Sequence, residues 1–305
     1  MAAVPLAAIV PLAGNDRCPI GVSTSAFGDL PRVTGRDNVD DVIRALKAAG
    51  ASHAELALSS VEPAPPSSGS FMGGSAAYPQ RVVLTPEQMA AVNSEARSAL
   101  RAWRLRTPPA ALEDVRERFA KNGLTVLACS CAYDDSFTDE EVEATFRQAG
   151  ALGVSSVSSP VTLGVARRLT PFAERHSISV AIHNQVDGNP GGAVSTHDLS
   201  DALALSPRML LKLDVGNLTA SNADAVAVLR QHLDRLSAVL VTDRLRNGGA
   251  SQPFGEGDTP IKDVLAAVTA SGRAVPILVG YTHIGLRSST QEVAASLKYV
   301  TGLLR

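Results

Sequence analysis

The segment that decides the fold starts with Leu236-Ser-Ala-Val-Leu-Val241 and Thr242-Asp243-Arg244, continues after a short spacer with Pro253-Phe-Gly-Glu-Gly-Asp-Thr-Pro260, and leads into Ile261-Lys-Asp-Val-Leu-Ala-Ala-Val268. The first run is apolar, as in a buried strand, and the last repeats apolar residues at the spacing of a helix. Glycines between them let the backbone approach a ligand closely, and the free N–H groups at a helix start can bind an anion. The segment therefore predicts a strand–helix unit with a functional loop at its turn.

Seven similar units fill the rest of the chain. The other strand-like segments lie near residues 18–27, 54–58, 124–131, 154–161, 178–183, 209–214 and 275–279, and helix-like segments separate them. Strands that are apolar throughout are typical of parallel sheets buried on both faces. Strict alternation at this count predicts an α/β fold, a single (β/α)8 TIM barrel. An open doubly wound sheet is less consistent with the sequence, because Gly21–Ala26 lacks the Gly-x-Gly-x-x-Gly turn.

The chain of 305 residues shows no shift in composition that would split the barrel. We expect residues 1–16 to form a flexible N-terminal arm, residues 17–305 to form the barrel, and Pro63–Pro79 to form a long loop. Met1–Leu12 is apolar but lacks the preceding basic residues of a secretion signal. We therefore expect a cytoplasmic protein, and export from a longer precursor remains the alternative.

Composition limits the classes of partner. A net charge of -2 and 4% aromatic residues argue against nucleic-acid binding, and no apolar stretch has membrane-span length. Three cysteines are too few for a disulfide framework. These features favour an enzyme with a small-molecule substrate, and a homo-oligomer stays open.

Polar residues gather at the predicted carboxyl ends of the strands, where TIM barrels carry their active sites. A buried carboxylate at a strand end needs a metal, a substrate hydroxyl or a cation as its partner, and an imidazole beside a carboxylate can move protons near neutral pH. The predicted catalytic residues are His183, Asp214, Asp243 and His283. The predicted substrate-binding residues are Glu55, Asn184, Asn217, Arg244 and Glu256.

Five segments in order resemble a known family. They are Trp103-Arg104-Leu105 before Thr107-Pro108, Ile182-His183-Asn184, Leu213-Asp214-Val215-Gly216-Asn217, Thr242-Asp243-Arg244 and Pro253–Asp258. From Pro19 onward the chain looks like the sugar phosphate isomerase/epimerase group of the xylose isomerase-like TIM barrels. The resemblance implies a divalent metal that polarises a substrate carbonyl and a carboxylate that moves the neighbouring proton.

The resemblance also implies metal ligands, and this sequence departs from them. Two glutamates, an aspartate and a histidine are implied, and Asp214 matches the aspartate. The His-x-Lys-Asp pattern reads Leu240-Val-Thr-Asp243, the final-strand glutamate position holds Val279 or Gly280, and the histidine of Asp-x-Gly-His is Asn217. One carboxylate with apolar and amide neighbours is a poor divalent-cation site. We therefore expect the usual metal centre to be eroded. A Mn²⁺, Mg²⁺ or Zn²⁺ site rebuilt around His183, Asp214 and His283 is the alternative.

Three hypotheses for the function follow from these residues. The first is an isomerase or epimerase, in carbohydrate metabolism, that acts on a sugar, a keto-sugar or a related oxygenated molecule by metal-free acid–base catalysis. The second is the same enzyme with an unconventional metal. The third is a non-catalytic barrel that binds a sugar-like ligand or a partner subunit, and a lyase on the same fold also stays open.

Overall fold

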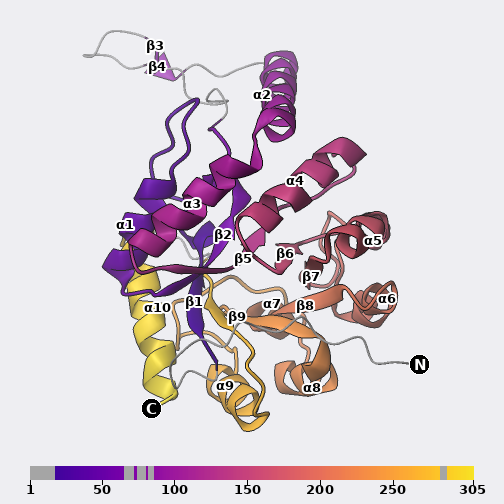
Figure 1. The fold of residues 1–305 in the computed structure, drawn as a ribbon. Coiled ribbons are helices and arrows are strands. Elements are labelled where there is room, and N and C mark those ends of the chain that lie inside the picture. The colour runs from indigo at the N-terminus through magenta and orange to yellow at the C-terminus, as the bar shows by residue number, and fades with distance from the viewer. Residues whose placement is uncertain (1–17, 65–71, 74–79, 82–85, 282–286) are drawn as a thin grey trace.

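Eight parallel strands close into a barrel in the computed structural model, which describes residues 18–64, 72–73, 80–81, 86–281 and 287–305. The barrel strands are β1 (Ile20–Ser23), β2 (His53–Ala57), β5 (Thr125–Ser130), β6 (Ser156–Ser159), β7 (Ser179–His183), β8 (Met209–Asp214), β9 (Leu236–Val241) and β10 (Ile277–Val279). Each strand pairs with the next along the chain, and β1 pairs with β10 to close the ring. The predicted TIM barrel is confirmed (Figure 1).

Helices surround the strands, as Figure 1 shows. They are α1 (Val39–Ala49), α2 (Pro86–Arg106), α3 (Pro109–Lys121), α4 (Asp139–Ala151), α5 (Leu163–His176), α6 (Leu199–Ala204), α7 (Val215–Ala220), α8 (Ala225–Gln231), α9 (Ile261–Ala270) and α10 (Ser289–Leu303). Short 3-10 turns lie at Thr24–Ala26, Leu58–Ser60, Thr196–Asp198 and Leu233–Arg235. Local signals set several boundaries: α1 ends at Gly50, which has a φ of 80°, and Thr138 begins α4 with a capping box.

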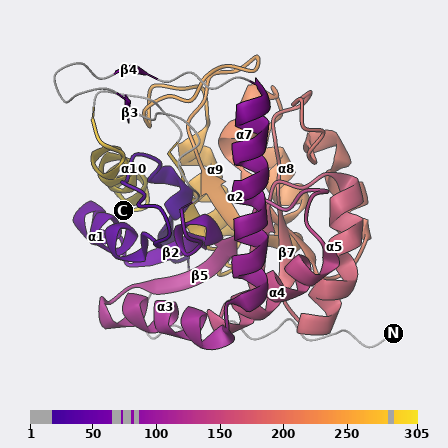
Figure 2. The ribbon, with the colours of Figure 1, turned by 90° about the horizontal axis from the view of Figure 1, so that it is seen from above.

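The segment between β2 and β5 departs from a simple helical connection. Helix α2 precedes α3 and lies beside α4, so two helices follow β2 instead of one (Figures 1 and 2). Met72–Gly73, inside the predicted Pro63–Pro79 loop, pairs with Gln80–Arg81, just after it, as a small antiparallel sheet, β3 and β4. Most of that loop, and the predicted arm at residues 1–16, lie outside the described residues.

Alternation along the strands separates two cores. On β9, Val239 and Val241 belong to the large apolar core between strands and helices, whereas Ala238 and Leu240 join Leu278 of β10 in a small separate cluster. Because successive side chains point to opposite faces of a strand, this small cluster fills the inside of the barrel. Beside it the inward side of β8 is polar: Lys212 and Asp214 pair in register with Ala238 and Leu240. No helix among the described residues is long and apolar enough to span a membrane.

Candidate active site

His183 and Asp214 meet at the carboxyl ends of β7 and β8. His183 Nε2 donates to Asp214 Oδ2 at 3.2 Å, and because a carboxylate only accepts, this contact places a ring proton on Nε2. The His183 side chain is 21% exposed, whereas that of Asp214 is 6% exposed. The other ring nitrogen, Nδ1, has no hydrogen-bond partner among the described residues. It is also not one of their buried polar atoms that lack a hydrogen bond. The pair thus lies at the barrel mouth, where two neighbouring strands end.

Asp214 is held as a carboxylate on both oxygens. Thr242 Oγ1 donates to its Oδ1 at 2.6 Å, and the backbone N–H of Asn217 donates to the same oxygen at 3.1 Å as the cap of α7. Burial alone would raise the pKa of Asp214, but the hydrogen bond and charge of His183, with the bonds from Thr242 and Asn217, lower that pKa below its ordinary value. The imidazole thus lies against a fixed negative charge.

Gly216 makes this arrangement sterically possible. A Cβ at that position would lie 2.1 Å from Thr242 Oγ1 and 2.8 Å from the Thr242 carbonyl oxygen. Only glycine therefore allows the first turn of α7 to approach the hydroxyl group that holds Asp214. The glycine in Asp214-Val-Gly-Asn217 thus allows Thr242 and Asn217 to hold the Asp214 carboxylate.

Asn184, Asn217 and Arg244 form a connected chain beside the pair. Asn184 Nδ2 donates to the Asp214 carbonyl oxygen at 3.1 Å, and its Oδ1 accepts from the Asp214 N–H at 2.7 Å. Asn217 Nδ2 donates to the Asn184 carbonyl oxygen at 2.9 Å, and Arg244 Nη1 donates to Asn217 Oδ1 at 2.8 Å. These three predicted substrate-binding residues therefore use their polar groups to fix the ends of β7 and β8.

Asp243 faces away from this pair and holds the glycine loop. Its Oδ2 accepts from the backbone N–H groups of Gly255 at 2.8 Å and Gly257 at 3.1 Å, and its Oδ1 accepts from Thr259 at 3.2 Å. A Cβ on Gly257 would lie 2.2 Å from Asp243 Oδ1. Gly257 therefore lets the backbone approach this carboxylate closely. Asp243 thus holds the loop in place, and its predicted catalytic role stays a prediction, while Glu256 on that loop is exposed.

Glu55 lies inside the barrel and forms an ion pair that the sequence did not reveal. It is 0% exposed, and its Oε2 accepts from Ser23 Oγ at 2.7 Å and from Lys212 Nζ of β8. Its Oε1 accepts from Ser158 Oγ at 2.6 Å. Burial raises the pKa of Glu55, but the charge and hydrogen bond of Lys212 and the two serine bonds lower it overall. Strands β2 and β8 are thus joined across the barrel by a buried ion pair.

The described residues do not fit a divalent metal. No group of three or more His, Cys, Asp and Glu among them is arranged to hold one. Leu240 is 4% exposed inside the barrel, and a Cβ on Gly280 would meet the side chains of Thr242 at 2.9 Å and Leu240 at 3.0 Å. Side-chain carbon atoms therefore occupy two positions at which the family resemblance implies metal ligands. His283, the third residue of the rebuilt site, lies outside the described residues.

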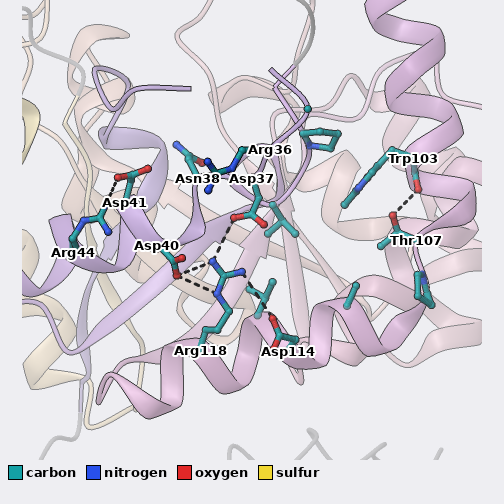
Figure 3. Close-up of a pocket in the computed structure, with 16 residues that line it drawn as sticks. Arg36, Asp37, Asn38, Asp40, Asp41, Arg44, Trp103, Thr107, Asp114 and Arg118 are labelled. Carbon is teal, nitrogen blue, oxygen red and sulfur yellow. Dashed lines mark hydrogen bonds and ion pairs between the residues drawn. The ribbon is translucent and has the colours of Figure 1, made fainter. Parts of the chain in front are cut away.

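A polar groove of about 930 Å³ lies elsewhere, between the start of α1 and helix α3 (Figure 3). Its charges largely neutralise one another: Arg118 pairs with Asp40 at 2.7 Å and Asp37 at 3.5 Å, and Arg44 pairs with Asp41. Neither His183 nor Asp214 lines it. We therefore place the candidate site at the barrel mouth, where an imidazole and a carboxylate meet.

Sequence comparison and structural comparison give different results. No protein-family model and no curated protein matches the chain. Solved structures do match: D-allulose 3-epimerase from Methylomonas sp. is 14% identical with a TM-score of 0.60, covering 96% of this chain and 100% of its own.

Two further matches differ in chemistry. The probable 3-DHS dehydratase AsbF from Bacillus anthracis is 12% identical, with a TM-score of 0.58 and coverage of 93% and 98%. The IOLI protein, solved with a binding zinc atom, is 12% identical, with a TM-score of 0.62 and coverage of 94% and 98%. At these identities the similarity establishes the fold, which is that of the xylose isomerase-like TIM barrels.

Proposed function

We propose that this protein is an enzyme that moves a proton next to a carbonyl group in a sugar, a keto-sugar or a related oxygenated small molecule, as an isomerase or epimerase. The observation that carries the proposal is the contact of His183 Nε2 with Asp214 Oδ2 at the carboxyl ends of β7 and β8. In a TIM barrel this end of the strands is the one that carries catalysis.

In this proposal the two residues have different parts in one step. His183 has its Nε2 bound to the carboxylate, so Nδ1 carries the free lone pair and can take a proton from a substrate carbon. Asp214 has a lowered pKa, so it remains ionised near neutral pH and stabilises the imidazolium that forms. Asn184 and Thr242 keep Asp214 in place while the proton moves. Returning the proton to the other face of the same carbon gives epimerisation. Returning it to the former carbonyl carbon, while the hydroxyl proton moves to the former carbonyl oxygen, gives isomerisation.

The proposed class of substrate is supported by the proteins that share the fold, and not by a side chain known to recognise a sugar. An epimerase of the keto-sugar D-allulose shares the fold over the whole of its own length. A chain described as a sugar phosphate isomerase/epimerase from Parabacteroides distasonis also shares it. Fold alone does not carry function, so the substrate belongs to the proposal.

A lyase is the second candidate, because a dehydratase shares the fold. Loss of water from a β-hydroxy carbonyl compound begins with the same removal of a proton next to the carbonyl group. The two candidates differ only in what leaves afterwards, so product analysis separates them.

The experiment is incubation of the full chain in D₂O with D-allulose, D-fructose, D-ribulose and dihydroxyacetone, followed by proton NMR. An isomerase or epimerase exchanges the proton next to the carbonyl and yields a rearranged sugar. A lyase yields an unsaturated carbonyl product that absorbs in the ultraviolet. No exchange above the buffer rate with any of the four compounds would count against the proposal, and binding without exchange would favour the non-catalytic barrel.

A further inference from the structure

Lys212 places a buried positive charge close to the His183–Asp214 pair. It is 3% exposed, and the register of the two strands sets it directly opposite His183. Asp214 is two residues further along β8, and residues i and i+2 share one face of a strand. The contact of Lys212 with Glu55 of β2 shows that this face points into the barrel. Lys212 therefore lies inside the barrel, one layer below Asp214.

Glu55 fixes the position of this charge. Its two oxygens accept from Ser23, Ser158 and Lys212, so the carboxylate has a hydrogen bond from three different strands. Four residues from β1, β2, β6 and β8 thus build one rigid polar layer. Burial raises the pKa of Glu55, but the charge and hydrogen bond of Lys212, together with the bonds from Ser158 and Ser23, lower it overall, and Glu55 remains a carboxylate. Lys212 is accordingly held in place as the cationic partner.

The ammonium group still has unused donors. It carries three N–H groups, and among the described residues only Glu55 accepts from it. Two donors on a buried cation are therefore left for an oxygen that these residues do not supply. Burying charged donors without acceptors is costly. This need points to a ligand oxygen, while Ser23 and Ser158 are already used by Glu55.

We propose that Lys212 is a catalytic residue that binds the substrate carbonyl oxygen and stabilises the negative charge that develops on it. The inference rests on the proposed function and names the group that does the electrophilic work. His183 Nδ1 takes the proton from the carbon next to the carbonyl, and the electron pair of that C–H bond forms a C=C bond. The C=O pair moves onto oxygen, which stays hydrogen-bonded to Lys212. The reverse movement returns the proton, so no oxidant or co-reactant is needed.

The ion pair favours hydrogen bonding over a covalent imine at Lys212. An imine requires a neutral amine as nucleophile, whereas Lys212 Nζ is engaged in a buried ion pair with the Glu55 carboxylate. Sodium borohydride reduction of the wild-type protein with the substrate present separates the two roles. No added mass at Lys212 agrees with the proposal, and a reduced adduct there would overturn it.

The main test is the double variant Glu55→Gln/Lys212→Met. Removing both charges leaves no buried ion without a partner, so the barrel is expected to stay folded. The rate of substrate proton exchange should fall about 100-fold or more, as for loss of an oxyanion donor, mainly in kcat. Unchanged exchange by a folded double variant would reject the role of Lys212. If the double variant exchanges normally while His183→Gln does not exchange, the proposed function still stands and only the role of Lys212 fails. If the wild type shows no exchange, both the proposed function and the role of Lys212 fail.

A second measurement uses only the wild-type protein and so does not depend on how a variant folds. Glycolohydroxamate, whose anion resembles the enediolate, should inhibit exchange about 100-fold more tightly than glycolamide, because only the former offers Lys212 a negative oxygen. Equal inhibition constants would contradict a cationic group at the carbonyl oxygen.

Discussion

Glu141, in the first turn of α4, binds α2 through a buried cluster of charges. Its side chain is 0% exposed, and it accepts hydrogen bonds from Arg97, Arg101 and Arg104 of α2. The backbone N–H of Thr138 donates to the same carboxylate at 3.0 Å. Substitution Glu141→Gln keeps the shape of the side chain but removes its charge, so we expect a clear loss of stability.

The magnitude follows from the pKa of Glu141. Burial raises it, but the arginine and Thr138 hydrogen bonds lower it from 4.5 to about 2. At about 1.4 kcal/mol per pKa unit, this shift corresponds to about 3 kcal/mol. Arg101 is 42% exposed, so solvent screening reduces the contribution, and we expect a loss of about 2–3 kcal/mol. For a chain of this size, that loss lowers Tm by about 4–6 °C.

The pH dependence gives the sharper test. Because the folded-state pKa of Glu141 is depressed, its contribution is fully present above the unfolded value and is lost as pH falls from 4.5 towards 2. Urea unfolding of wild type and Glu141→Gln should therefore differ most at pH 7, differ clearly less at pH 3, and converge only as the pH approaches 2. The control is Glu117→Gln in an exposed pair with Lys121, expected within about 0.5 kcal/mol of wild type. A difference that does not change with pH would refute the electrostatic origin.

Three further predictions concern the barrel mouth. Asp214→Asn should lower the proton-exchange rate about 1,000-fold without unfolding the protein, because the amide cannot stabilise an imidazolium; a rate within tenfold of wild type would exclude Asp214 from catalysis. Gly216→Ala should also lower that rate, by about tenfold or more, because its methyl group displaces Thr242; a wild-type rate would show that the Thr242 bond is dispensable. Asp243→Ala should instead destabilise the protein by about 2–4 kcal/mol in urea unfolding, since three backbone N–H groups lose their acceptor; intact stability with lost activity would favour the predicted catalytic role of Asp243.

The architecture could be predicted because it depends on local patterns. Apolar runs such as Met209–Asp214 mark buried strands, and Gly50 and Thr138 mark helix ends, so all eight barrel strands were located from sequence. The contact of His183 with Asp214 was also within reach, because parallel neighbouring strands bring their ends together. Both residues follow apolar runs that end in polar side chains.

The rest depends on partners far apart in the chain. In the sequence, Lys212 is a lone positive charge in an apolar strand, and its partner Glu55 is 157 residues away and across the barrel. Its position two residues before Asp214, on the same strand face, was the available signal. Arg104 is likewise 7% exposed and pairs with Glu62 and Glu141, both distant in the sequence. Sequence shows residue types along a strand, but not which charges face each other once the barrel closes.

The central claim is that His183 moves a proton at the barrel mouth. Deuterium incorporation next to the substrate carbonyl, followed by NMR in wild type, His183→Gln and His176→Gln, tests it most directly. His176 is a matched control because it contacts a carboxylate, Glu143, at 2.8 Å on the outer helices. Our account predicts incorporation by wild type and His176→Gln and a loss of about 100-fold or more in His183→Gln. Equal incorporation by all three proteins would contradict it.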